Sequence, residues 1–180
     1  MVITVNAALP LTAPAVLKPW INHYPPGVPS EVDVSSYSSL VELLEVAWRM
    51  HASRGAAECM GASISFGAVD ELSSALGAWL QAKGLVKGEQ VAVMMPNLPQ
   101  YMVAIAAILR AGCVVVNVNP LYTARELEHQ LKDSGAKAII VLENFAHTLE
   151  VVIDSTDVQH VVLCAMGDRL GFWKGQFINF

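Results

Sequence analysis

Four short apolar runs recur at nearly constant spacing, and they constrain the fold more than any other feature of the chain. They occupy residues 91–95, 114–118, 138–142 and 160–164, so their starts lie 23, 24 and 22 residues apart. Continuous Val and Ile runs are typical of strands in a parallel sheet that helices cover on both faces. A leucine-rich repeat has a similar period, but its Leu and Asn pattern does not recur. The spacing therefore predicts right-handed βαβ units in a layered α/β/α fold with a mainly parallel sheet.

Helix start and stop signals fill the intervals between these runs. Residues 98–110 have helical spacing and close on Gly112, with Arg110 as the charge at the helix end. Thr123 is placed to cap a helix that closes on Gly135, and Asn144 to cap another over residues 147–154. Each crossover of the predicted sheet is therefore helical.

The region before the first run predicts two more helices and a short strand. Ser39 and Glu42 have capping-box spacing, ahead of a helix that should extend to about residue 53. A second helix has its apolar face over residues 72–80, and Trp48 and Trp79 are both expected in the core. Residues 61–66 predict a short strand with its turn, and we identify no strand ahead of them.

Composition limits the class of protein and its partners. The chain has 180 residues, 54% of them apolar and 15% charged, with a net charge of −5. Such apolar content excludes disorder for most of the chain, and the absence of a basic run argues against nucleic acid as a partner. Its three cysteines and five histidines are scattered without metal-ligand spacing, which predicts reduced thiols, no metal site and a cytoplasmic location.

The N-terminal part differs in composition from the rest. Residues 1–36 are rich in Pro, Val and Ser, which predicts an extended segment ahead of an α/β domain over residues 37–180. Residues 1–17 are uncharged but lack the basic start of a signal peptide, and prolines interrupt them. We therefore expect neither export nor a membrane span.

The expected ligand position is the edge where the strands' carboxyl ends meet, in the loops at 96–99, 119–122 and 143–145. Asn97, Asn119 and Tyr122 are the candidates to face a substrate there, although turn and capping roles also fit Asn119 and Tyr122. These loops contain no glycine, and neither GxGxxG nor GxxxxGK[ST] occurs in the chain. Residues 61–65 approach a nucleophile elbow but end in Ser65 where glycine is required, which favours a cap or turn serine. We assign no catalytic, cofactor-binding or metal-binding residue.

Four segments of the chain read QVAVMMPN (90–97), ILRAG (108–112), VNVNPLYT (116–123) and ELEHQL (126–131). Together they resemble the sequences of bacterial long-chain fatty acyl-CoA ligases of the adenylate-forming superfamily. The resemblance extends from about Trp20 to Phe180. It departs from the family at Gly88-Glu89-Gln90, where Gly-Asp-Arg is common, and at residues 57–63.

The resemblance implies a two-step reaction: ATP and a fatty acid give an acyl-adenylate and pyrophosphate, and coenzyme A then displaces AMP. ATP, Mg and coenzyme A are the parent enzyme's cofactors and co-substrates. The family's phosphate loop, adenine-binding segments and catalytic lysine lie later in its sequence, so residues 37–180 are expected to be an incomplete N-terminal subdomain, inactive by itself. The resemblance leaves open a homodimer and peripheral attachment at the inner face of the cell membrane.

A standalone binding or dimerisation module of the same fold is the alternative function. The large apolar side chains of residues 170–180 motivate it, because such groups normally bury against another surface. The same residues also fit a helix docked on this domain or a polypeptide that continues. The sequence alone leaves these alternatives open.

Overall fold

The computed structural model describes residues 18–169, and the chain divides into two units, Met1–Ser36 and Tyr37–Phe180. In the first unit a short 3-10 helix, η1 (Pro19–His23), is followed by exposed, irregular backbone. Lys18 forms an ion pair with Glu31. The carboxylate of Asp33 accepts hydrogen bonds from Ser35 and Ser36, which lower its pKa. The predictions for residues 1–17 and 170–180 lie outside the described residues.

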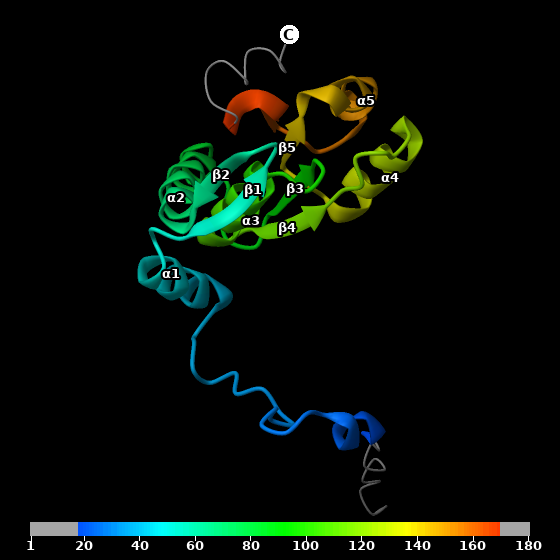
Figure 1. The fold of residues 1–180 in the computed structure, drawn as a ribbon. Helices are drawn as coiled ribbons and strands as arrows, with labels where there is room; N and C mark the ends of the chain where they lie inside the picture. Colours follow the sequence, from blue (N-terminus) through cyan, green and yellow to red (C-terminus); the bar gives the residue numbers. More distant parts are fainter. Residues whose placement is uncertain (1–17, 170–180) are drawn as a thin grey trace, which may run out of the picture. The chain divides into compact units, whose positions relative to one another are not determined.

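A four-stranded parallel sheet forms the centre of the second unit (Figure 1). Its strands are β3 (Gln90–Met94), β4 (Val114–Asn117), β5 (Ala138–Leu142) and β6 (His160–Cys164), in the spatial order β4-β3-β5-β6. All four predicted strands are confirmed to within one residue at each end. Strand β5 is buried along its whole length, which explains why its sequence is a continuous apolar run.

Helices cover both faces of this sheet, as the sequence predicts. Alternate side chains of β3 point to opposite faces: Val91 and Val93 belong to one core, and Ala92 and Met94 to the other. The first core includes residues of α2 (Phe66–Ala82) and α3 (Pro99–Arg110). The second includes residues of α4 (Ala124–Ser134) and α5 (Ala146–Val152). The α/β/α layering follows from this division.

A small third core joins α1 (Leu40–Met50) to a two-stranded antiparallel hairpin, β1 (Gly55–Cys59) and β2 (Ala62–Ser65). Trp48 and Ile64 are buried in it. The hairpin turn lies at Met60 and Gly61, which both have positive φ (51° and 74°), as a type I′ turn requires.

The hairpin corrects two expectations. A strand does precede residue 61, because β1 is held by pairing with β2 although its sequence contains no Val, Ile or aromatic residue. Ser63 lies within β2, opposite Glu58, so it is neither a nucleophile elbow nor a turn residue. Two residues later, Ser65 caps a helix: its hydroxyl accepts from the Ala68 N–H at the start of α2.

Helix boundaries agree with the sequence in most places and differ in two. The cap at Thr123 is confirmed as a complete capping box with Glu126, and Gly135 ends α4 with φ of 65°. Helix α1 ends at Met50 rather than near residue 53, because the next four residues turn back toward β1. Asn144 does not cap a helix. It lies inside the 3-10 turn η2 (Glu143–Phe145) that continues directly from β5.

A further difference concerns the burial of an aromatic side chain. Trp48 is buried as expected, but Trp79 is 37% exposed at the surface of α2, where the Lys83 ammonium lies 5.5 Å from its ring centroid. Helical periodicity placed Trp79 on the apolar face; in the fold its ring makes an edge contact with the His160 ring of β6, 6.4 Å between centroids, and is otherwise left partly exposed. Among residues 18–169, no helix combines the length and apolar character needed to cross a bilayer.

Candidate functional site

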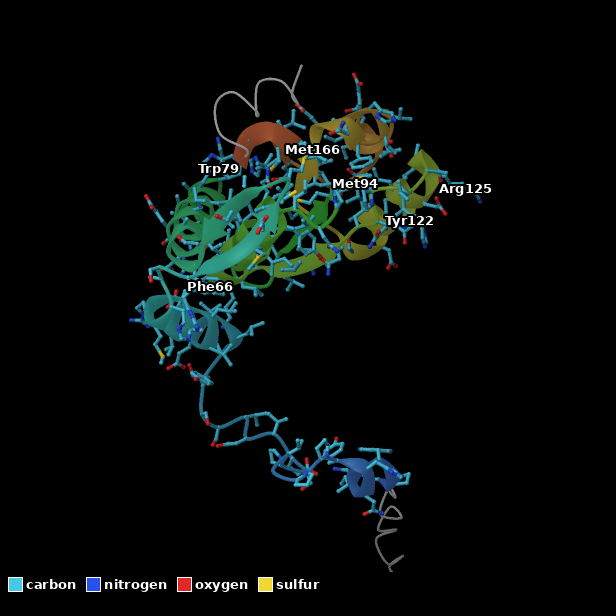
Figure 2. The ribbon with its side chains drawn as sticks, viewed as in Figure 1. Phe66, Trp79, Met94, Tyr122, Arg125 and Met166 are labelled. Carbon is cyan, nitrogen blue, oxygen red and sulfur yellow. The ribbon has the colours of Figure 1, made fainter. Side chains whose placement is uncertain are left out.

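The three loops expected to hold a ligand lie at one edge of the sheet. Strands β4, β3 and β5 are parallel neighbours, so the segments that leave their carboxyl ends emerge side by side. Asn97 follows β3, and Asn119 and Tyr122 follow β4. Figure 2 shows Met94 at the end of β3 and Tyr122 near the start of α4. The fold therefore places the three candidate residues in adjacent loops.

Two of the three candidates have structural roles in their loop. The Asn119 Oδ1 accepts from the Leu121 N–H at 3.0 Å, and the Asn119 carbonyl accepts from the Tyr122 N–H at 3.1 Å. This Asx turn directs the chain from β4 into α4. Tyr122 is half-buried and packs against the core beneath α4. Asn97 is exposed in the loop before α3. Contact of any of them with substrate stays a prediction.

Two hydrogen bonds to Asn117, which the sequence analysis missed, fix the end of β4 against its neighbouring helices. The Tyr101 hydroxyl donates to Asn117 Oδ1 at 2.8 Å, and the Gln130 Nε2 donates to the Asn117 carbonyl at 2.8 Å. These bonds connect β4 to both α3 and α4. The available signal was Asn117 itself, a polar residue that interrupts an otherwise apolar run.

The edge does not fit a triphosphate or a metal ion by itself. Its three loops contain no glycine, lysine or arginine, so neither a close backbone approach nor a cation is available for phosphate oxygens. Within residues 18–169, no group of three or more His, Cys, Asp or Glu side chains is arranged to hold a metal ion. Any nucleotide at this edge would need its charge stabilised by groups other than these loops.

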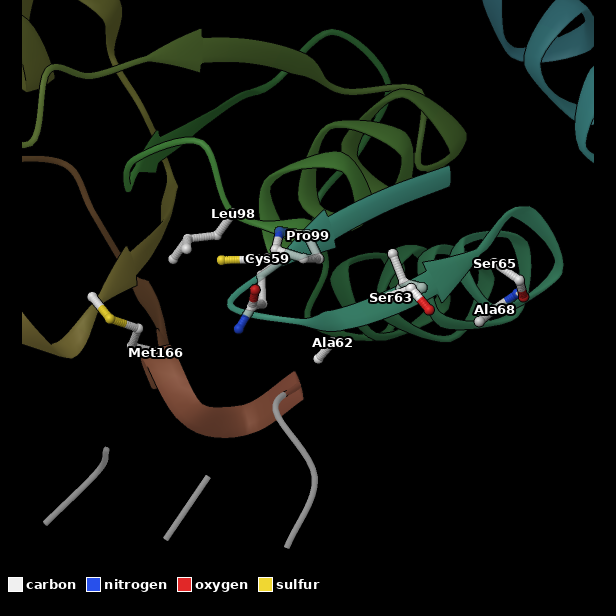
Figure 3. A pocket seen from close by; sticks show the side chains of 10 residues that line it. Cys59, Ala62, Ser63, Ser65, Ala68, Leu98, Pro99 and Met166 are labelled. Carbon is white, nitrogen blue, oxygen red and sulfur yellow. The ribbon is translucent and has the colours of Figure 1, made fainter. Parts of the chain in front are cut away.

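A cavity of about 350 Å³ borders the loop before α3 (Figure 3). Its walls come from four separate parts of the chain: the β1–β2 hairpin, the start of α2, the start of α3 and the turn η4 (Met166–Arg169). In Figure 3 the Cys59 sulfur points toward Leu98, and Met166, from η4, lies farther from both. Sequence patterns could not reveal this cavity because it depends on the packing of distant segments.

Arg110 has a larger role than the helix-end charge expected from the sequence. Its Nη1 donates to the Asp70 carbonyl at 2.6 Å and to Ser73 Oγ at 3.0 Å. Its Nη2 pairs with the carboxylates of Asp70 and of Glu45, the latter at 3.1 Å. The guanidinium carbon lies 5.2 Å from the ring centroid of Trp48. Arg110 therefore connects α1, α2 and α3. The glycine that follows, at position 112, has φ of 79° and ends the helix as expected.

The cysteines of the described residues are all free. Burial raises the pKa of the Cys113 and Cys164 thiols. Cys59 is half-buried and lines the cavity. Within residues 18–169, no hydrogen bond joins a cysteine thiol to a basic side chain that could activate it as a nucleophile, so no catalytic cysteine is indicated.

Comparison with known proteins agrees with the resemblance noted in the sequence. The chain is 56% identical over 164 residues to a long-chain-fatty-acid–CoA ligase of Salmonella typhimurium, and 33% identical over 157 residues to one of Bacillus subtilis. These matches cover 91% and 87% of this chain but only 29% and 28% of the relatives. The chain thus spans less than a third of their length.

Solved structures show the same fold. A long-chain-fatty-acid–CoA ligase from Archaeoglobus fulgidus superposes with a TM-score of 0.64 at 27% identity, covering 78% of this chain and 29% of that one. The family model described as "AMP-binding enzyme" matches residues 44–178, three quarters of the sequence. The fold, the relatives and this match agree, and the chain belongs to the AMP-binding enzyme family.

Proposed function

We propose that this chain is the N-terminal part of a long-chain fatty acid–CoA ligase. The parent enzyme would convert ATP and a fatty acid to an acyl-adenylate and pyrophosphate, and then transfer the acyl group to coenzyme A with release of AMP. The observation that carries the proposal is 56% identity to a curated ligase over 91% of this chain. Relatives of this activity recur at 49–54% identity.

Within that enzyme the chain's residues act as a scaffold. The buried sheet fixes the positions of the loops after β3, β4 and β5, and the Asn117 and Asn119 hydrogen bonds hold the second of these loops. Asn97, Asn119 and Tyr122 are the residues that we propose face the substrate. ATP and Mg would be held mainly by other parts of the enzyme, because the described loops do not fit a triphosphate.

We also propose that the isolated chain has no turnover, that the parent enzyme is cytoplasmic with reduced thiols, and that nucleic acid is not one of its partners. The free cysteines and the net charge of −5 support the last two points. Homodimer formation and peripheral membrane attachment belong to the proposal only as properties of the parent enzyme.

A chimera tests the ligase proposal directly. The 164-residue region of the Salmonella relative that matches this chain is replaced by the corresponding 164 residues of the chain, and palmitoyl-CoA formation is measured with palmitate, ATP and coenzyme A. We expect activity in the chimera and no pyrophosphate release by the 180-residue chain alone. A folded but inactive chimera would count against the ligase role, and adenylate formation by the isolated chain would refute the scaffold role.

A further inference from the structure

The central sheet has an open edge at β6. Within residues 18–169, β6 pairs with β5 on one side and with no strand on the other. The backbone N–H and C=O groups on its outer side therefore have no ladder partner there. An edge of this kind accepts a further strand through main-chain hydrogen bonds.

The two faces of β6 are covered unequally. Val162 and Cys164 pack against the first core. Val161 and Leu163 point to the opposite face, which carries α4 and α5, and they are 38% and 61% exposed. Strands β3 and β5 are buried on both faces, as is usual in a parallel sheet. On the α4–α5 face, β6 lacks this cover.

A groove of about 350 Å³ lies on this uncovered face. Val161 and Leu163 form its floor, and one side of α5 forms its wall. The lining is mostly apolar, and its two polar side chains, His147 and Glu150, are exposed to solvent. A helix with one apolar side would fit here, because it could bury that side on the floor and keep its polar residues in water.

The handedness of the crossovers shows which face a further unit would use. Helices α4 and α5 lie on one face, and each leads the chain toward the β6 side of the sheet, from β4 past β3 to β5 and from β5 to β6. Helix α3 lies on the other face and leads the opposite way, from β3 to β4. All three crossovers thus have the same hand, as right-handed βαβ units require. A connection from β6 to a new strand on its outer side must then cross the α4–α5 face, which is the face that β6 leaves exposed.

We propose that the part of the parent enzyme that follows this chain supplies a helix whose apolar side packs into this groove, and then a strand that pairs in parallel with the outer edge of β6. This inference rests on the proposed function, because it requires the longer enzyme: the chain covers only 29% and 28% of the Salmonella and Bacillus relatives. A helix followed by a strand is the order that a βαβ unit starting from β6 requires. The open edge, the exposed face and the handedness of the crossovers are separate observations, and one such unit accounts for all three.

Hydrogen–deuterium exchange of the β6 amides tests the proposal. Exchange is measured by mass spectrometry in the 180-residue chain and in the chimera with the Salmonella relative. Pairing of the outer edge should slow exchange of β6 in the chimera by about ten-fold or more relative to the isolated chain. Strand β5 is the internal control: it is already paired on both sides, so it should exchange at similar rates in the two proteins.

Leu163→Lys is the informative variant, and Val151→Lys is its control, because Val151 is exposed on α5 but does not line the groove. In the chimera, Leu163→Lys should remove most of the protection of β6, since it places a charge under the docked helix, whereas Val151→Lys should leave the protection unchanged. In the isolated chain neither variant should change exchange of β6, because both residues are exposed there.

Equal exchange of β6 in the two unmodified proteins would overturn the proposal, whether β6 is unprotected in both or is already protected in the isolated chain by residues 170–180 or by a second copy. This comparison requires no variant, so it decides even if Leu163→Lys does not fold. It is also independent of turnover. An inactive chimera with a protected β6 would count against the ligase role alone, and an active chimera with an unprotected β6 would count against this proposal alone.

Discussion

Replacing Arg110 tests whether one side chain holds three helices together. Its side chain is only 12% exposed, and its guanidinium bonds to the Asp70 carbonyl, to Ser73 Oγ and to the carboxylates of Asp70 and Glu45. It also lies over the ring of Trp48. Arg110→Met removes all of these contacts while it keeps most of the side chain's apolar volume. The variant therefore isolates the contribution of the charged group.

The expected loss can be added up from these contacts. A hydrogen bond from a charged donor to a buried carbonyl contributes about 1.5–3 kcal/mol, and the contact with the Trp48 ring about 0.5–1 kcal/mol. The carboxylates of Asp70 and Glu45 are 35% and 39% exposed, so each ion pair contributes less than about 1 kcal/mol. We expect Arg110→Met to lower the free energy of unfolding by about 3 kcal/mol.

Urea denaturation followed by circular dichroism measures this loss. With an m-value of about 2 kcal/mol/M, the midpoint should fall by about 1.5 M. Arg49→Met is the control, since Arg49 is exposed on α1 and bonds only to a carbonyl of its own helix, so its effect should stay within about 0.5 kcal/mol.

Arg110→Lys distinguishes a simple positive charge at the end of α3 from the set of hydrogen bonds that the guanidinium makes to α1 and α2. Lysine keeps a charge at the end of α3 but cannot reproduce the forked hydrogen bonds, so we expect a loss of about 1.5 kcal/mol. If the lysine variant matches the unmodified protein within about 0.5 kcal/mol, a simple helix-end charge is sufficient and the reasoning from the structure is wrong.

Three further predictions concern other elements. Gly77→Ala should cost about 1–3 kcal/mol in urea denaturation, because its Cβ would lie 3.0 Å from a backbone oxygen of α3, whereas Gly55→Ala meets no atom within 4 Å. Hydrogen bonds from the Thr123 cap lower the pKa of Glu126 below its usual 4.5, so this carboxylate stabilises the fold above that pH and the contribution is lost as pH falls through the lowered value. Glu126→Gln should therefore be less stable than the unmodified protein at pH 7 and equal to it under strongly acidic conditions. Iodoacetamide at pH 8, followed by mass spectrometry, should label half-buried Cys59 before Cys113, because burial raises the pKa of the Cys113 thiol.

Each of these predictions has a contrary result. Equal stability of the two glycine variants would show that α2 and α3 separate at little cost. A Glu126→Gln deficit that persists unchanged into strong acid would show that the effect is not electrostatic. First labelling at Cys113 would show that the first core opens more readily than the hairpin.

Much of the central sheet could be predicted from local sequence. A strand that is buried on both faces needs apolar residues at every position, so β3, β5 and their neighbours are visible as Val- and Ile-rich runs. The Thr123 capping box and the glycine after α4 were also predictable, because both satisfy backbone groups within a few residues of themselves. The edge that carries the loops follows from the parallel direction of the strands, whereas the order β4-β3-β5-β6 was not predicted from the sequence.

Elements that depend on distant partners could not be predicted. Strand β1 has a weak strand sequence and exists through its pairing with β2, and the exposure of Trp79 depends on what covers α2 rather than on helical spacing. Arg110 pairs with Asp70 and Glu45, which lie 40 and 65 positions before it in sequence. The cavity is lined by segments as far apart as Cys59 and Met166.

The sequence by itself thus determined the class of fold, the strands, the capped helices and the family resemblance, because these depend on short-range periodicity and on the residues themselves. Only the tertiary structure decided which polar atoms are paired, which aromatic side chain is covered and where a cavity opens. Burial and hydrogen-bond satisfaction are properties of the packed chain, since they depend on atoms that come together only when distant segments meet.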